Sequence, residues 1–125
     1  MYFVYVLRCV DSSLYCGYTT DPVHRFRAHT GLVKGGAKYT KSRPPVKVEA
    51  VWSCGAEGDA LSFERAVKKL SRAEKEILIT DGAAAAAFPE LAEKGPFRRE
   101  PFYVGAIEEV IVRKKDEQYE DIGNI

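Results

Sequence analysis

The chain has 125 residues and a formal net charge of +1, with 46% apolar and 30% charged residues, which is the composition of one ordinary globular domain. No apolar run approaches the roughly 20 residues of a membrane-spanning helix, which argues against an integral membrane protein. The three cysteines are odd in number and contain no C-x-x-C pair, so we expect small buried side chains rather than a disulfide framework or a zinc site.

Charge is distributed unevenly along the chain. Residues 1–76 hold 13 Lys and Arg against 8 Asp and Glu, whereas residues 77–125 hold 6 against 10. A basic first half is typical of a protein that binds nucleic acid, although a solvated charged surface has the same pattern. The N-terminus lacks the basic leader of a signal peptide, so we expect a cytoplasmic protein with no membrane partner.

The first 18 residues predict an antiparallel hairpin. Residues 2–10 are rich in Tyr, Phe and Val and predict a strand, and Asp11–Ser13 is a turn signal. Leu14–Tyr18 predicts the second strand. Gly17 lies inside this strand, where a glycine often marks a bulge or a close approach of another backbone.

A helix and a basic loop follow the hairpin. Asp21 is a candidate N-cap and Pro22 suits the first helical position, so we predict a helix that ends near His29. The stretch "TGLVKGGAKYTKSRPP", residues 30–45, contains three glycines and two prolines. We expect a long loop there without regular structure, and loops of that length in compact domains are often functional.

The next segments predict one strand and two helices. Val46–Ser53 alternates between apolar and polar residues and predicts a third strand, and residues 54–59 predict a turn. Ala60–Leu70 predicts an amphipathic helix. The capping box "SRAE" at Ser71–Glu74 predicts the start of a further helix that ends near Ile79.

The composition changes after Thr80. The stretch "DGAAAAAF" favours a helix, Pro89 interrupts it, and "EKGPFRREP" is a break in regular structure. Residues 102–112 fit a strand or a helix equally well. We therefore predict a domain over residues 1–80 and a C-terminal extension, residues 81–125, whose role the sequence does not reveal.

Several short motifs resemble one family when they are taken together. "FVY" at Phe3–Tyr5 and "YCG" at Tyr15–Gly17 carry tyrosines ten residues apart, and "DPVHRFRAH" with Arg25 and His29 follows. With "ALSFERAVKKLSRAEKEIL" around Glu64, their order and spacing resemble the small single-domain bacterial branch of the GIY-YIG nuclease superfamily over roughly residues 1–80. The departures are Phe3, Val4 and Cys16 in place of Gly, Ile and Ile, and the absence of a matching asparagine, near whose position Lys68 stands.

The resemblance implies an α+β fold with a small three-stranded antiparallel sheet flanked by helices, and a DNA endonuclease with one divalent metal ion, Mg or Mn. It places the metal on Glu64, Arg25 on phosphate oxygens, and His29 where it can accept or hold a tyrosine proton. Tyr5 is the first candidate for the general base, and Tyr15 beside it suits a base or a phosphate contact. Core packing of both tyrosines and a surface ion pair of Glu64 with Lys68 explain the same residues without catalysis.

The expected nucleic-acid contacts lie around that site. They are Gly17, Arg27, Lys34, Lys38, Lys41, Arg43 and Lys68. Such contacts recognise backbone or shape rather than base sequence, as in nucleases of DNA repair and recombination; RNA is not excluded, and a protein partner is a candidate source of specificity. The alternatives are a non-catalytic nucleic-acid-binding module of the same fold and a scaffold that acts through its acidic extension.

Overall fold

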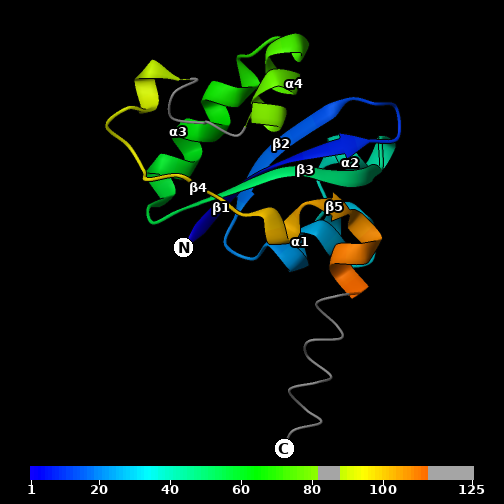
Figure 1. Ribbon diagram of the computed structural model, residues 1–125. Helices are drawn as coiled ribbons and strands as arrows, with labels where there is room; N and C mark the ends of the chain where they lie inside the picture. The colour runs from blue at the N-terminus through cyan, green and yellow to red at the C-terminus, as the bar shows by residue number, and fades with distance from the viewer. Residues whose placement is uncertain (82–87, 113–125) are drawn as a thin grey trace, which may run out of the picture.

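The computed structural model describes residues 1–81 and 88–112 (Figure 1). In chain order the elements are β1 (Tyr2–Cys9), β2 (Leu14–Thr19), α1 (Pro22–His29), α2 (Lys38–Ser42), β3 (Pro45–Cys54), α3 (Glu57–Lys68), α4 (Arg72–Asp81), the 3-10 turn η1 (Pro89–Leu91), β4 (Arg98–Arg99), the 3-10 turn η2 (Pro101–Tyr103) and β5 (Gly105–Ala106). Residues 107–112 are helical. The helix predicted in the alanine run and residues 113–125 lie outside the described residues.

The sheet is antiparallel, with the strand order β2-β1-β3-β4, and β5 pairs with the opposite end of β3. The predicted α+β class is confirmed, but the sheet has five strands rather than three. The two additional strands come from the C-terminal extension and contain two residues each, which is too short to leave an alternating pattern in the sequence. β1 is central and β2 is an edge strand, which leaves one side of β2 free of backbone pairing in the described structure.

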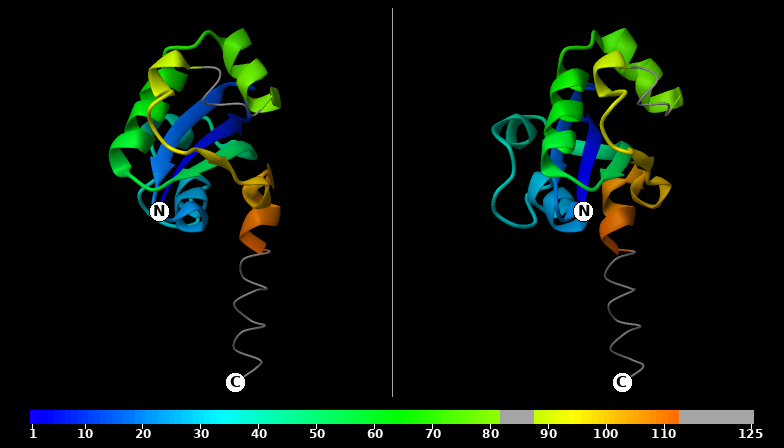
Figure 2. Two further views of the ribbon diagram at one scale, coloured as in Figure 1. Left: turned by 60° about the vertical axis from the view of Figure 1, so that its left-hand side comes forward. Right: turned by 90° about the vertical axis from the view of Figure 1, so that its left-hand side faces the viewer.

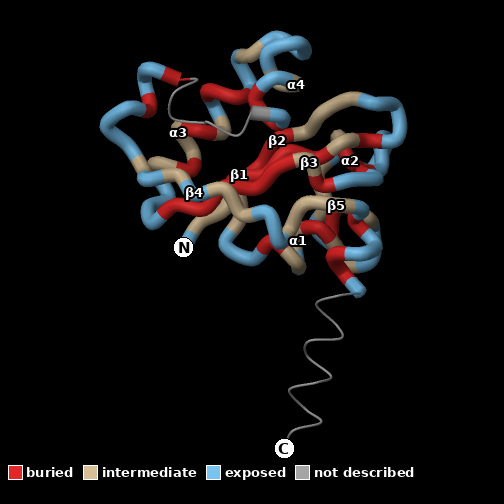
Figure 3. Tube along the Cα trace, in the orientation of Figure 1, coloured by how far each residue is buried: buried red, intermediate tan, exposed pale blue. Residues whose placement is uncertain are grey.

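Helices cover both faces of the sheet, and each face has its own core (Figures 1 and 2). One core joins Val4, Val6 and Cys16 to α3 and η1, and the other joins Tyr5 and Leu7 to α1 and residues 107–112. Strand alternation produces this division, because successive side chains of β1 point to opposite faces. Figure 3 shows most of β1 and of the second half of β3 buried between these layers, whereas β2 is buried only in its middle.

The C-terminal extension contributes to both cores. Phe88 and Leu91 pack on the α3 face, and Ile107, Val110 and Ile111 pack on the α1 face. The sequence leaves strand and helix open for residues 102–112. In the structure this segment contains the end of η2, then β5, and then the helical residues 107–112. The domain boundary at residue 80 stays a prediction, although the core of the fold extends past it.

The predicted helix signals are confirmed at two N-termini. Asp21 accepts a hydrogen bond from the backbone of His24 at 3.2 Å, and the side chains of Ser71 and Glu74 each bind the other's backbone N–H group at 3.2 and 3.0 Å. α3 begins at Glu57 rather than Ala60, since acidic side chains in its first turn favour the helix dipole.

The prediction of an irregular loop over residues 30–45 is wrong for residues 38–42, which form α2. This single turn is too short to show helical periodicity in the sequence. Its formation depends on tertiary contacts: Thr40 is 1% exposed, and its hydroxyl donates to the Ala37 carbonyl at 3.0 Å. No helix within residues 1–81 and 88–112 is long and apolar enough to cross a membrane.

Candidate active site

The strand register places the two predicted tyrosines on one face of the sheet. Tyr5 of β1 pairs with Gly17 of β2, and Leu7 pairs with Tyr15. Because side chains alternate, Tyr5 and Tyr15 point to the same side. α1 covers that side, and its Arg25 and His29 lie one helical turn apart on the face that meets the tyrosines.

Four predicted site residues are in contact. His29 Nε2 lies 2.7 Å from Tyr5 Oη, and Arg25 Nε donates to the same oxygen at 3.3 Å. The Tyr15 ring meets the His29 ring edge to face, with 5.1 Å between their centroids. Arg25 also donates to the backbone carbonyl of Gly35, which holds its guanidinium beside the loop. One phenol oxygen therefore contacts both a guanidinium and an imidazole.

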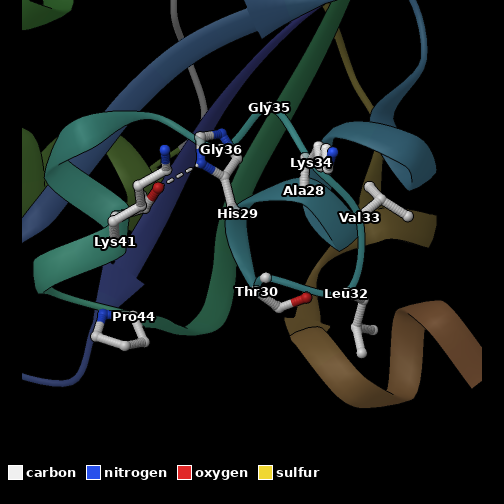
Figure 4. Close-up of a pocket in the computed structure, with 12 residues that line it drawn as sticks. Ala28, His29, Thr30, Leu32, Val33, Lys34, Gly35, Gly36, Lys41 and Pro44 are labelled. Atoms are coloured by element: carbon white, nitrogen blue, oxygen red, sulfur yellow. Dashed lines mark hydrogen bonds between the residues drawn. The ribbon is translucent and has the colours of Figure 1, made fainter.

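α2 adds two residues to this cluster that the sequence did not indicate. His29 Nδ1 lies 2.8 Å from Thr40 Oγ1, the contact that the dashed line marks in Figure 4. Tyr39 stacks on Tyr15, with 5.8 Å between the centroids and 26° between the planes. Neither contact can be predicted from residue spacing, because each joins α2 to another element and the sequence predicts α2 as part of a loop.

Burial sets the protonation of the central pair. His29 is 3% exposed, and burial, followed by the nearby Arg25 charge, lowers its pKa from 6.5 to about 4. Tyr5 is 1% exposed, and burial raises the pKa of its phenol although the Arg25 hydrogen bond opposes this shift. At neutral pH a neutral phenol therefore faces a neutral imidazole. Both shifts oppose separate charges on this pair, so an isolated phenolate is disfavoured and the hydrogen-bonded neutral pair is the resting state.

Gly17 makes room for the Tyr5 phenol. A Cβ atom at Gly17 would lie 2.6 Å from Tyr5 Oη and 2.8 Å from its Cζ. The close approach that a strand glycine indicates is therefore made by a side chain of the adjacent strand. A contact between Gly17 and nucleic acid stays a prediction.

We expect Gly17→Ala to lower the free energy of unfolding by about 1–3 kcal/mol, because the new methyl group overlaps the Tyr5 hydroxyl. Gly58→Ala is the matched control: nothing lies within 4 Å of a Cβ there, and alanine favours α3 by about 0.5–1 kcal/mol. Urea denaturation measures both. Equal stability of Gly17→Ala and wild type would contradict the close contact.

Among the described residues Glu64 has no hydrogen bond to the tyrosine cluster. Its partner Lys68 nevertheless lies near Tyr15, since that phenol adds to the rise in the pKa of Lys68 that the Glu64 hydrogen bond dominates. Glu64 belongs to α3, which packs on the opposite face of the sheet, and its Oε1 accepts a hydrogen bond from Lys68. Its charge adds to burial in raising the pKa of Cys16 to about 12, which places the carboxylate near β2. Within residues 1–81 and 88–112, no hydrogen bond or ion pair joins Glu64 to Tyr5 or Arg25.

The donor set near Glu64 is small. The described residues contain no group of three or more His, Cys, Asp or Glu side chains that could hold a metal ion. A single carboxylate is nevertheless compatible in kind with Mg²⁺, which often takes one or two carboxylates and completes its shell with water and phosphate oxygens. Glu64 therefore fits as an anchor, and Lys68 is its present partner.

Four predicted basic contacts, Lys34, Lys38, Lys41 and Arg43, are exposed in α2 or beside it, whereas Lys68 is on α3 and Arg27 is on α1. Lys34 and Lys41 line a pocket of about 640 Å³ that also borders His29 (Figure 4). Arg43 lies over the Tyr39 ring at 4.6 Å and pairs with Asp11 at 3.2 Å. Lys38 is exposed on α2. Arg27 of α1 is half-buried, and its buried Nε has no hydrogen-bond partner among the described residues.

Known proteins resemble this chain over most of their length. UPF0213 protein BH0048 of Halalkalibacterium halodurans is 42% identical over 79 residues, which cover 63% of this chain and 82% of that protein. UPF0213 protein YsiG of Lactococcus lactis is 44% identical over 93 residues, 74% of this chain and 88% of that protein. The solution NMR structure of UPF0213 protein BH0048 from Bacillus halodurans is 43% identical, with a TM-score of 0.43 over 64% of this chain and 84% of that one.

The family assignment rests on the match to a family model. The model of the GIY-YIG catalytic domain matches residues 1–77, which include both tyrosine strands, α1, α2 and α3. Its match ends in α4, before the segment that contributes β4 and β5. The names of the UPF0213 relatives state no substrate. The chain belongs to the GIY-YIG family, whose domain is typically a nuclease and generally uses a divalent metal.

Proposed function

We propose that the protein is a divalent-metal-dependent endonuclease that hydrolyses phosphodiester bonds of DNA and recognises backbone or shape. The observation that carries the proposal is the contact of Tyr5 Oη with both His29 and Arg25. Three free, buried cysteines suit a reducing compartment such as the cytoplasm. A role in DNA repair and a protein partner that supplies specificity belong to the same proposal.

The Tyr5–His29 pair is the proposed proton acceptor. The attacking water gives a proton to Tyr5 Oη while the phenol gives its own proton to His29 Nε2, so no free phenolate forms, and His29 afterwards releases this proton to solvent. The water oxygen then bonds to phosphorus, the bond to the leaving oxygen breaks, and solvent protonates that oxygen. Tyr5 is 1% exposed in the free protein, so the proposal requires the water to enter beside Tyr15 and Arg25 when DNA binds.

The remaining residues stabilise charge and position the phosphate. Arg25 and Tyr15 are partly exposed and present a guanidinium and a phenol at the surface of the cluster. Glu64 would hold the metal ion, which supplies electrostatic stabilisation of the phosphate when it is bound. Lys68 then becomes available for a phosphate oxygen.

We expect Glu64→Gln to reduce metal-dependent cleavage by at least about 10²-fold, because an amide is a weaker ligand for a hard cation. Cleavage of a panel of linear, branched and flapped DNAs is measured while Mg²⁺ or Mn²⁺ is titrated, with EDTA as the metal-free arm. Glu57→Gln, an exposed change on the same helix, is the control and should retain the wild-type rate. Cleavage that persists in EDTA, or in Glu64→Gln at wild-type metal concentrations, would contradict the metal site.

The basic residues of α2 give a second prediction. Lys38→Gln and Lys41→Gln should each reduce the slope of log K against log[salt] by about 0.7–0.9, the contribution of one phosphate contact. Fluorescence anisotropy in EDTA measures binding without cleavage. Lys94→Gln is the control, since Lys94 donates to Ser62 on α3 at 3.1 Å. An unchanged slope in both α2 variants would remove α2 from the interface.

The second candidate function is nucleic-acid binding without catalysis. One observation favours it: among the described residues the carboxylate of Glu64 is paired with Lys68 and makes no hydrogen bond to Tyr5, Tyr15 or Arg25. In that case Tyr5 and His29 are a buried hydrogen-bonded pair of the core. Binding that remains equal in wild type and Tyr5→Phe, with no product in either, would favour this candidate.

A further inference from the structure

We infer that Thr40 is a positioning residue that fixes His29 as the Nδ1–H tautomer, so that the Nε2 lone pair faces Tyr5. The inference rests on the proposed function for its catalytic consequence. Its structural content stands on a chain of hydrogen bonds that runs through five groups, from the Arg25 guanidinium to the Ala37 carbonyl. The groups at both ends of this series of hydrogen bonds require the same donor-to-acceptor direction.

The α2 end fixes the Thr40 hydroxyl. Thr40 Oγ1 lies 3.0 Å from the Ala37 carbonyl oxygen and 2.8 Å from His29 Nδ1. A carbonyl oxygen can only accept, so the hydroxyl proton belongs between Thr40 and Ala37. The Thr40 oxygen then accepts, and His29 Nδ1 must be the donor. The opposite arrangement would leave two acceptor oxygens facing each other at 3.0 Å.

The Arg25 end fixes the Tyr5 hydroxyl. Arg25 Nε–H donates to Tyr5 Oη at 3.3 Å, and a guanidinium has no acceptor. Tyr5 Oη therefore accepts from Arg25 and directs its own proton to His29 Nε2, 2.7 Å away. A proton on Nε2 would place two donors at one phenol oxygen and leave the phenol proton without this acceptor.

Burial makes the Thr40 hydroxyl hard to replace. Thr40 is 1% exposed and His29 is 3% exposed, so solvent does not readily supply the missing acceptor. Tyr5 of β1, Tyr15 of β2 and Arg25 of α1 lie against His29, and Lys34 and Lys41 line the pocket that borders it. The described neighbours include no carboxylate, so the hydroxyl of α2 orients a neutral ring. A neutral ring has two tautomers, and the hydrogen bond at one nitrogen selects between them.

The direct test is the tautomer of His29 in the full chain. Uniformly ¹⁵N-labelled protein is examined by long-range ¹H–¹⁵N correlation of the imidazole rings at neutral pH, and His24→Gln identifies the signals of the other histidine. We expect wild-type His29 to carry its proton on Nδ1. A proton on Nε2 would overturn the inference whatever the protein cleaves.

Two substitutions separate positioning from packing. Thr40→Val keeps the shape of the side chain and removes the hydroxyl, and Thr40→Ser keeps the hydroxyl and loses a methyl group. We expect Thr40→Val to mix the two His29 tautomers and to slow single-turnover cleavage by about 10- to 100-fold, the usual effect of losing a partner that orients a functional histidine. Thr40→Ser should retain the Nδ1–H tautomer and most of the rate, although it is the variant with the packing defect.

The outcomes distinguish this inference from the proposed function. A pure Nδ1–H tautomer in wild type and Thr40→Ser, with mixing in Thr40→Val, supports the positioning role even if no DNA is cut, in which case the hydrolysis proposal fails. An unchanged tautomer and rate in a folded Thr40→Val protein would overturn the inference. A rate that follows thermal stability across the variants, with Thr40→Ser as slow as Thr40→Val, would overturn it as well.

Discussion

Replacing Tyr5 with phenylalanine is expected to slow cleavage by about 10²- to 10⁴-fold while leaving the fold intact. The substitution removes one oxygen, and with it the acceptor of Arg25 and the donor to His29. Neither neighbour loses its other partner, since Arg25 still binds the Gly35 carbonyl and His29 still binds Thr40. Single-turnover cleavage with enzyme in excess measures the loss.

Tyr18→Phe is the matched control for this prediction. Its phenol lies on β2 and donates to Glu57 at 3.2 Å, on the side of the sheet that faces α3. It should retain the wild-type rate and DNA affinity. If Tyr5→Phe cleaved as fast as Tyr18→Phe, the hydroxyl of Tyr5 would be a packing feature only, and the proton relay would be excluded.

Removal of residues 82–125 is expected to unfold the protein. The deletion exposes both cores, because it takes away Phe88, Leu91, Ile107, Val110 and Ile111, each 8% exposed or less. At about 1.5–3 kcal/mol for each buried side chain, the loss is roughly 8–15 kcal/mol, as large as the whole stability of a typical domain. Circular dichroism and thermal denaturation of the truncated chain measure it. This deletion therefore does not separate a scaffold role of the acidic extension from a loss of fold.

Two point variants of the full-length protein test whether the C-terminal extension is part of the core. Leu91→Ala, at a site with 0% exposure, should cost about 2–5 kcal/mol, because it leaves a cavity under η1. Val112→Ala, at a site with 54% exposure, should change stability by about 0.5 kcal/mol or less. A truncated chain that melts cooperatively at the wild-type temperature would show that residues 1–81 form the complete domain.

Local signals explain what the sequence predicted well. The hairpin, the capped helix α1 and the capping box of α4 depend on residue types at fixed short spacings, and all three are present. Once the hairpin is known, strand alternation explains why the side chains of Tyr5 and Tyr15 point to the same face of the sheet. The family resemblance, not the local pattern, predicts Tyr5, Tyr15, Arg25 and His29 as site residues. In the structure these four side chains are in contact.

Tertiary contacts explain what the sequence did not predict. α2 is a single turn, and its Thr40 meets His29 from eleven positions further along the chain, across a segment that contains three glycines. β4 and β5 pair with β3 over two residues each, which no propensity argument detects. The position of Glu64 relative to the tyrosines depends on how α3 crosses the sheet, and helical periodicity predicts only which residues of α3 face the core.

The most direct test of the catalytic claim measures binding and cleavage in the same samples. Wild type and Tyr5→Phe are mixed with end-labelled linear, branched and flapped DNA in Mn²⁺ or EDTA, and bound fraction and product are recorded over time. We expect both proteins to bind in every condition, wild type to form product in Mn²⁺ alone, and Tyr5→Phe to form at most a hundredth as much. Binding by both proteins without product in Mn²⁺ on any DNA would contradict the catalytic claim.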